Sequence, residues 1–230
     1  MSATSQGTAP TALIVGASRG LGLGLCREFR QRGWQVIGTV RGEVPGELAG
    51  DAIEVETVDI NEPGEVAALR QRLDGRALDL LFVNAGVSND QSETIGQVST
   101  EVFTRVMVTN ALSPMRVVET LGDLVTPAGT VAVMSSVLGS VGGNTDGGYE
   151  VYRASKASLN TLMRSFAARN KRDGRALLCL HPGWVRTAMG GSAAPLDVET
   201  SARGLADTII ARQGKGGLSF LDYKGETVPW

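Results

Sequence analysis

Residues 11–22 read Thr-Ala-Leu-Ile-Val-Gly-Ala-Ser-Arg-Gly-Leu-Gly, an apolar run that ends in a cluster of glycines. The first part, Thr11–Ala17, is rich in β-forming residues and predicts a buried strand. Apolar residues at helical spacing follow and predict a helix over Leu21–Arg32. The glycines lie at the turn between the two, where glycine lets a pyrophosphate approach the backbone and the free N–H groups of the helix. This context predicts a dinucleotide-binding turn, and a tight turn without a ligand is the alternative.

The rest of the chain alternates between strand and helix patterns. The strands are expected at Trp34–Arg41, Ala52–Ile60, Leu78–Asn84, Gly129–Ser136, Arg175–His181 and Leu218–Asp222, and the helices at Pro63–Leu73, Thr100–Val125, Gly148–Asn170 and Val198–Arg212. Such alternation implies right-handed crossovers and a parallel sheet covered on both faces. We therefore expect an α/β fold, a single doubly wound Rossmann-type sheet over residues 11–230, preceded by a disordered tail at residues 1–10.

Composition excludes several classes of protein. The 230 residues carry a formal net charge of -2, which does not favour nucleic acid or an anionic membrane as a partner. Neither a membrane-length apolar run nor a signal peptide is found, and the expected location is the cytoplasm. Cys26 and Cys179 are expected to be buried thiols, and with the single His181 they form no metal-binding pattern, so no metal is expected.

Seven motifs in chain order carry a resemblance to a known family. They are GASRGLG at 16–22, Asp59-Ile60, Asn84-Ala85-Gly86, Asn110, Ser136, Tyr152-Arg-Ala-Ser-Lys156 and HPGWVRT at 181–187. Together they resemble the short-chain dehydrogenase/reductase family. The stretches 138–148 and 220–230 resemble its subgroup of C-factor and sniffer-type carbonyl reductases. Val15 and Val83 depart from the family pattern, and the interval between Ser136 and Tyr152 is longer than usual.

The resemblance implies hydride transfer between a nicotinamide and a carbonyl or alcohol carbon, with a small-molecule substrate. Tyr152 and Lys156 are four residues apart on one helical face, where the lysine cation would lower the pKa of the tyrosine toward neutrality. Tyr149 is the rival tyrosine. Ser136 would orient the carbonyl, with Ser135 and Ser140 as alternatives, and Asn110 would support a water relay.

The expected cofactor is NADP(H). Arg41 follows the second strand where an acid would otherwise repel a 2′-phosphate, and Arg19 is a second cation within reach. Asp59 would face the adenine edge or cap the end of its strand. The predicted cofactor-binding residues are Gly16, Ser18, Arg19, Gly20, Leu21, Gly22, Arg41, Asp59, Ile60, Asn84, Ala85, Gly86, Tyr152, Lys156, Pro182, Gly183, Val185 and Thr187.

Three further expectations concern shape and assembly. Pro114 cannot donate a hydrogen bond to the Asn110 carbonyl, so the helix is expected to bend there and leave that carbonyl for a water. The small residues of Ala188–Pro195 predict a mobile lid. The family resemblance implies a homo-oligomer. The alternative functions are a nucleotide-binding signalling protein with little turnover, and an epimerase or dehydratase on the same fold.

Overall fold

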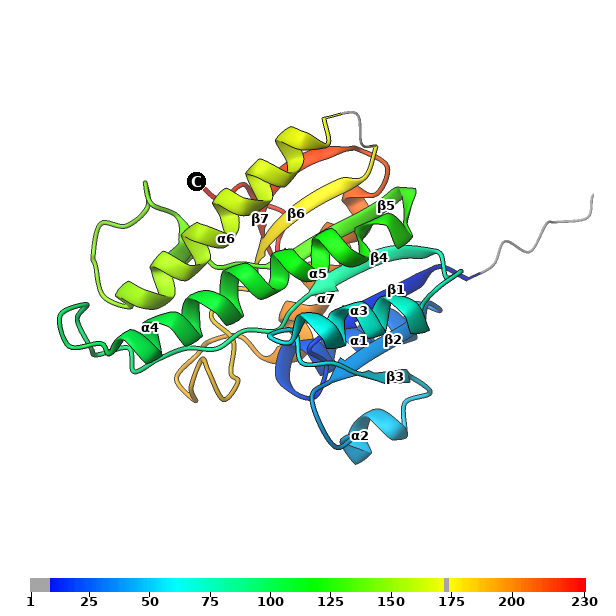
Figure 1. The fold of residues 1–230 in the computed structure, drawn as a ribbon, viewed down its shortest axis with the longest axis horizontal. Coiled ribbons are helices and arrows are strands. Elements are labelled where there is room, and N and C mark those ends of the chain that lie inside the picture. The colour runs from blue at the N-terminus through cyan, green and yellow to red at the C-terminus, as the bar shows by residue number, and fades with distance from the viewer. Residues whose placement is uncertain (1–8, 172–173) are drawn as a thin grey trace, which may run out of the picture.

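A parallel seven-stranded sheet forms the centre of the molecule, with strand order β3-β2-β1-β4-β5-β6-β7 (Figure 1). The computed structural model describes residues 9–171 and 174–230, so most of the tail expected at residues 1–10 lies outside the described residues. The strands are β1 Thr11–Val15, β2 Gln35–Val40, β3 Glu54–Thr57, β4 Leu78–Val83, β5 Val125–Met134, β6 Ala176–His181 and β7 Gly217–Asp222. The expected doubly wound α/β fold is confirmed.

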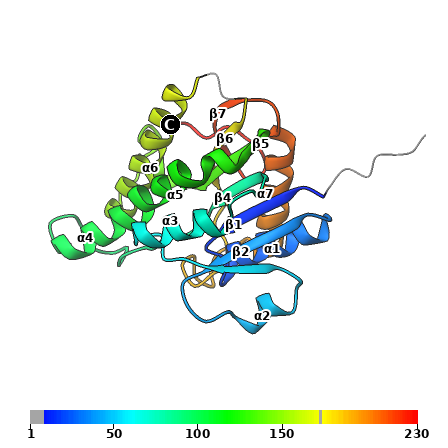
Figure 2. The ribbon, with the colours of Figure 1, turned by 45° about the vertical axis from the view of Figure 1, so that its right-hand side comes forward.

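Helices cover both faces of this sheet (Figures 1 and 2). They are α1 Gly20–Gln31, α2 Gly46–Ala49, α3 Pro63–Arg72, α4 Thr100–Met107, α5 Ser113–Leu121, α6 Glu150–Arg169 and α7 Val198–Arg212, with short turns η1 Val108–Leu112, η2 Gly122–Leu124 and η3 Val137–Gly139. One apolar cluster packs α3, α5 and α6 onto the sheet, and a second packs α1 and α7 onto its other face. The central strands β1 and β4 are buried along nearly their whole length, as their apolar runs predicted.

The chain reverses its direction of winding between β1 and β4. From β1 the crossovers run outward to β2 and β3, and the chain then returns to the other side of β1 at β4. Ligands of such sheets bind in the crevice beyond the carboxyl ends of the strands at this switch point. The glycine-rich loop follows β1 and Asn84 follows β4, so two predicted motifs meet at the crevice.

The expected helix Thr100–Val125 is wrong as a single element. It consists of α4, the π-turn η1, α5 and the 3-10 turn η2, and Val125 already belongs to β5. In the π-turn the Ser113 N–H bonds to the Val108 carbonyl, five residues back. Since Pro114 has no N–H, a regular helix could not have continued its bonding through Asn110. The interruption was therefore predicted at the right place, and its form is a π-turn.

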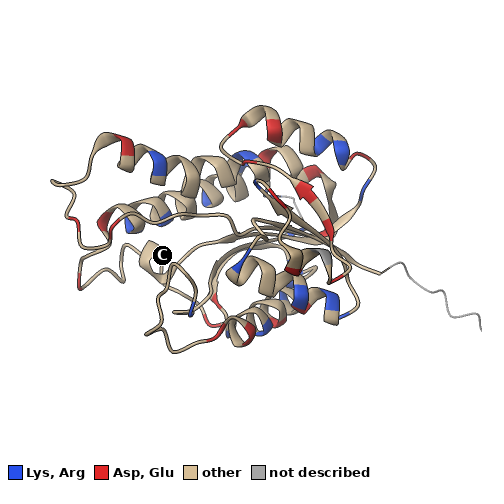
Figure 3. Ribbon diagram, turned by 90° about the horizontal axis from the view of Figure 1, so that it is seen from below, with Lys and Arg blue, Asp and Glu red and all other residues tan. Residues whose placement is uncertain are grey.

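Two other boundaries differ from expectation. The strand expected over Ala52–Ile60 shrinks to β3, because only Glu54–Thr57 pair with β2 at the edge of the sheet. Strand β5 begins earlier than expected, at Val125, where an irregularity in its pairing with β4 admits Pro127. Viewed from below, Lys, Arg, Asp and Glu are interspersed along the helices and do not separate by sign (Figure 3).

Candidate active site

The turn after β1 is shaped by glycines that cannot be replaced without collision. Gly16 has φ +91°, and a Cβ there would lie 2.9 Å from the Ala85 Cα. A Cβ on Gly22 would lie 2.0 Å from the Gly16 carbonyl oxygen. Helix α1 begins at Gly20, and no side chain caps its first N–H groups. The close backbone approach and these uncapped donors together form a cradle suited to a phosphate.

The segment after β4 lies against this turn. The Asn84 Nδ2 donates to the Gly16 carbonyl at 2.8 Å, and the Asn84 and Ala85 N–H groups both donate to the Val15 carbonyl. A Cβ on Gly86 would lie 3.2 Å from the Asn110 Oδ1 and 3.5 Å from the Lys156 Nζ. Residues 84–86 therefore stand between the glycine turn and the predicted catalytic side chains, and a Cβ at 86 would be in tight contact with the Asn110 side chain.

The Asn110 side chain has all of its hydrogen-bonding groups engaged. Its Oδ1 accepts from the Val87 N–H at 2.8 Å, and its Nδ2 donates to the Val87 carbonyl at 2.8 Å and to the Ser155 Oγ at 3.0 Å. This amide is fully buried, so these bonds compensate its loss of hydration. It thus ties the π-turn to the loop after β4 and to α6, and any water relay would use the backbone carbonyl of Asn110.

Ser136, Tyr152 and Lys156 come together at the carboxyl end of β5. The Ser136 side chain lies close enough to the Tyr152 hydroxyl to lower the pKa of that group. The Lys156 Nζ lies 5.6 Å from the centroid of the Tyr152 ring and donates to the Met134 carbonyl at 2.8 Å. Because Tyr152 and Lys156 are one turn apart on α6, the helix presents both side chains to the same crevice.

Burial dominates the ionisation of both groups. Although part of the Tyr152 ring is accessible, burial of its hydroxyl raises its pKa to about 12, while the nearby Ser136 side chain lowers it. Burial likewise lowers the pKa of Lys156 to about 8. The expectation that Lys156 brings the Tyr152 pKa toward neutrality is therefore wrong for the cofactor-free protein. The pKa of Tyr152 is raised because desolvation of its hydroxyl outweighs the attraction from Lys156, which is already bonded to a backbone carbonyl.

The rival residues are occupied elsewhere. The Ser135 Oγ donates to the Asn160 Oδ1 at 2.7 Å within the core, and the Ser140 Oγ donates to the Trp230 carbonyl. Tyr149 precedes α6 in the left-handed region, at φ 53°, and it is exposed. Its neighbour four residues on, Arg153, donates from Nε to the carbonyls of Gly147 and Gly148.

The loop after β6 reaches back to the glycine turn. A Cβ on Gly20 would lie 3.6 Å from the Thr187 Cγ2, so the predicted cofactor-binding residue Thr187 borders the first turn of α1. The Pro182 carbonyl accepts from the Ser201 Oγ, and Gly183 has φ +82°. Val185 is buried and bridges to Leu196. Thr187 therefore brings this loop beside the glycine turn at the start of α1.

Hydrogen bonds hold the segment Ala188–Pro195, which was expected to be a mobile lid. The Gly190 N–H donates to the Thr187 Oγ1, and the Gly190 carbonyl accepts from the Trp184 indole at 2.8 Å. The Arg186 guanidinium donates to the carbonyls of Ala194 and Pro195. The small residues of this segment allow a tightly tied loop, and mobility stays a prediction.

The predicted ribose end of the crevice carries exposed cations. In the described parts of the chain, Arg19 and Arg41 have neither an ion pair nor a side-chain hydrogen bond, and Ser18 beside them is exposed. The Asp59 Oδ1 accepts from the Asn61 N–H, so Asp59 caps the turn after β3, and Ile60 is buried. The two guanidinium groups remain available to an anion.

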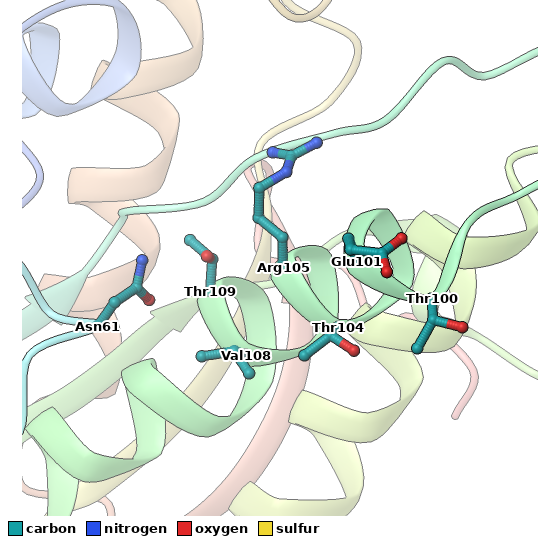
Figure 4. Close-up of a pocket in the computed structure, with 7 residues that line it drawn as sticks. All are labelled: Asn61, Thr100, Glu101, Thr104, Arg105, Val108 and Thr109. Carbon is teal, nitrogen blue, oxygen red and sulfur yellow. The ribbon is translucent and has the colours of Figure 1, made fainter.

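A cavity of about 450 Å³ lies on the outer side of α4 and η1 (Figure 4). It is lined by Asn61, Thr100, Glu101, Thr104, Arg105, Val108 and Thr109, none of which was predicted as a site residue. Asn61 directly follows Ile60 in the chain, and Thr109 directly precedes Asn110. The cavity therefore borders the crevice, but it contains none of the predicted catalytic residues. Nothing in the sequence pattern pointed to it.

Within residues 9–171 and 174–230, no group of three or more His, Cys, Asp or Glu side chains is placed to bind a metal ion. No helix in the same ranges combines the length and apolar character required to cross a bilayer. The cytoplasmic location stays a prediction.

Comparison with known proteins gives consistent matches. The family model described as short chain dehydrogenase matches residues 10–196. A solved structure of a short-chain dehydrogenase/reductase from Burkholderia multivorans with bound NADP is 50% identical, covers 96% of this chain and 100% of that chain, and superposes with a TM-score of 0.93. A carbonyl reductase from Pseudomonas aeruginosa PAO1 in complex with NADP is 38% identical, with 97% and 100% coverage and a TM-score of 0.89. The C-signal protein of Myxococcus xanthus is 39% identical over 155 residues, which is 66% of this chain and 93% of that protein.

Proposed function

The chain belongs to the short chain dehydrogenase family, and from that premise we propose that it is an NADP(H)-dependent carbonyl reductase. The proposed reaction is reversible hydride transfer between the nicotinamide and a carbonyl or alcohol carbon of a small molecule. The observation that carries the proposal is that the Lys156 Nζ lies 5.6 Å from the centroid of the Tyr152 ring, with Ser136 close enough to affect the Tyr152 pKa. Solved relatives with 50% and 38% identity contain NADP, and the second of them is a carbonyl reductase.

The residues present fit the cofactor. The cradle at Gly16 and Gly22, which a Cβ would fill, and the uncapped start of α1 suit the pyrophosphate. Arg19 and Arg41 suit a 2′-phosphate, since a guanidinium binds phosphate oxygens with two parallel hydrogen bonds. Residues 84–86 and Thr187 would flank the nicotinamide end. When bound, NADP(H) supplies or accepts the hydride.

The side chains of this protein would handle the proton and orient the substrate. Tyr152 keeps its proton at neutral pH, because burial raises its pKa to about 12, and can therefore donate it to a carbonyl oxygen during reduction. Ser136, close to the same hydroxyl, would hold that oxygen. Lys156 would place a cation beside the phenolate that remains, and the Asn110 backbone carbonyl would hold a water that resupplies the proton.

Turnover of NADPH with a panel of aliphatic and aromatic aldehydes and ketones tests the proposal. We expect carbonyl-dependent oxidation of NADPH, with kcat/KM for NADPH above that for NADH. A carbonyl reductase forms one molecule of alcohol for each NADPH oxidised. An epimerase or dehydratase consumes no net NADPH, so this ratio distinguishes the reactions. Absence of oxidation with every carbonyl would contradict the proposal.

A signalling role is the second candidate, and the 39% identity to C-signal is the observation that favours it. Such a protein would bind NADP(H) tightly and change conformation without turnover. Titration of NADPH fluorescence alongside the turnover assay separates the two, since binding without oxidation is expected only of the signalling protein.

The proposal includes a homo-oligomer, as the family resemblance implies. Phe103 on α4 and Leu162 on α6 are large exposed apolar side chains on helices that pack against each other. Sedimentation or size-exclusion chromatography at micromolar concentration tests this. A monomer at all concentrations would contradict it.

A further inference from the structure

The chain after β7 folds back toward the crevice. Thr227 forms an antiparallel bridge with Leu221, and the Val228 N–H donates to the Phe220 carbonyl at 2.9 Å. This return carries Trp230 to the loop between β5 and α6, residues 135–149, about 90 positions away in sequence. The stretch 220–230, which the proposed reaction leaves without a role, therefore ends beside the loop that contains Ser136.

The backbone of Trp230 binds this loop, and its ring contacts α6 and β7. Its carbonyl oxygen accepts from the Ser140 Oγ and from the Gly142 N–H, both at 3.2 Å. The Arg164 guanidinium of α6 lies 4.3 Å from the centroid of the indole. The centroid of the Phe220 ring, on β7, lies 5.3 Å from that of the Trp230 ring. The cation–π contact and the aromatic pair fix the indole, and the carbonyl then fixes the loop.

The loop between Ser136 and Ser140 has little freedom to move independently. The Ser136 Oγ accepts from the Leu138 N–H at 3.1 Å, and the Gly139 N–H donates to the Ser136 carbonyl at 2.8 Å. Gly139 packs directly on α6, since a Cβ there would lie 2.9 Å from the Lys156 Cβ. A displacement at Ser140, only four residues from Ser136, would therefore reach the Ser136 side chain, which lies close to the Tyr152 hydroxyl.

We propose that Trp230 is a positioning residue, which with Arg164 and Ser140 holds the β5–α6 loop so that Ser136 stays against the Tyr152 hydroxyl. This inference rests on the proposed function and assigns the chain's last segment to the same site. Trp230 acts only through the loop. Its removal affects the alignment of the substrate carbonyl, and cofactor binding at the glycine turn is untouched.

The test compares Trp230→Ala and Trp230→Phe with Ile210→Ala, a control on α7 whose exposure of 36% matches the 37% of Trp230. We expect Trp230→Ala to lower kcat about tenfold, because small misplacements of catalytic groups have effects of that order or larger. The Kd for NADPH should not change. Trp230→Phe retains an aromatic face for Arg164 and should recover most of kcat, and Ile210→Ala should match the wild type.

A double-mutant cycle identifies the route of the effect. In a Ser136→Ala background, Trp230→Ala should lower kcat less than about twofold further, since the group that it positions is already absent. An equal loss in both backgrounds, or a lower Tm with unchanged kcat, would overturn the inference.

Hydrogen exchange separates this inference from the proposed function. In Trp230→Ala, peptides covering residues 135–148 should exchange faster while peptides of α1 do not, whether or not the wild type reduces any carbonyl. Absence of turnover in the wild type would refute the proposed function alone. Unchanged exchange in residues 135–148 would refute the positioning role, even in an active enzyme.

Discussion

Replacing Lys156 with methionine should stabilise the cofactor-free protein at neutral pH while it abolishes turnover. The Lys156 side chain is only 3% exposed, and burial lowers its pKa from 10.5 to about 8. At about 1.36 kcal/mol per pKa unit, holding this group charged costs the folded state roughly 3 kcal/mol at pH 7. Methionine is of similar length and needs no hydration.

Part of this gain is lost with the hydrogen bond from the Lys156 Nζ to the Met134 carbonyl. A hydrogen bond from a charged group contributes about 1.5–3 kcal/mol, so the net gain in the free energy of unfolding should be about 1 kcal/mol at pH 7. The lysine would be retained for its function, since an active site can lower stability.

The pH dependence of the gain follows from the direction of the pKa shift. Because the folded pKa is depressed, the unfolded chain binds more protons between pH 8 and 10.5, and the stability of the wild type rises across this interval. The cost is complete below pH 8 and falls to less than about 1 kcal/mol at pH 10. The advantage of Lys156→Met should therefore shrink as pH rises.

Urea unfolding of the wild type and Lys156→Met at pH 7, 8, 9 and 10 measures the difference between their free energies of unfolding. The contributions of the other titrating groups cancel in this difference. Tyr152, with a raised pKa, destabilises the folded state only above about pH 10, and it is present in both proteins. A variant less stable than the wild type at pH 7, or a difference constant from pH 7 to 10, would refute the reasoning.

Three further changes probe the cofactor turn and the bend. Arg41→Asp should reverse the preference from NADPH to NADH, by about 10-fold or more in the ratio of kcat/KM values, and an unchanged ratio would exclude Arg41 from the 2′-phosphate site. Gly22→Ala places a Cβ 2.0 Å from the Gly16 carbonyl, so NADPH binding by fluorescence should fall by more than about 10-fold; normal affinity would mean that the turn has another shape. Pro114→Ala restores a helix donor and should lower kcat more than it raises the KM for NADPH, while an unchanged kcat would make the π-turn a packing feature only.

The order of elements and the place of the site could be predicted because both depend on local pattern. The apolar run before Gly16 and the buried run before Asn84 each predict a strand of a parallel sheet. Such a sheet brings the ends of β1 and β4 to one edge without any knowledge of distant contacts. The spacing of Tyr152 and Lys156 likewise places them on one helical face.

What the sequence could not provide depends on tertiary contacts. The π-turn at Val108–Leu112 adds a residue to one helical turn, and the apolar spacing around Asn110 is compatible with a regular helix. The pKa of Tyr152 depends on how much water reaches its hydroxyl, which spacing to Lys156 does not reveal. The contact between Trp230 and Ser140 joins positions 90 apart.

The most direct test of the account is the activity of Tyr152→Phe beside Tyr149→Phe, with NADPH affinity measured for both. If Tyr152 supplies the proton, Tyr152→Phe should lose more than about 100-fold in kcat with a nearly unchanged Kd for NADPH, because only its buried hydroxyl is removed. Tyr149 is exposed, so Tyr149→Phe should remain close to the wild type. A Tyr152→Phe variant that retains full turnover, or a loss confined to Tyr149→Phe, would contradict the account.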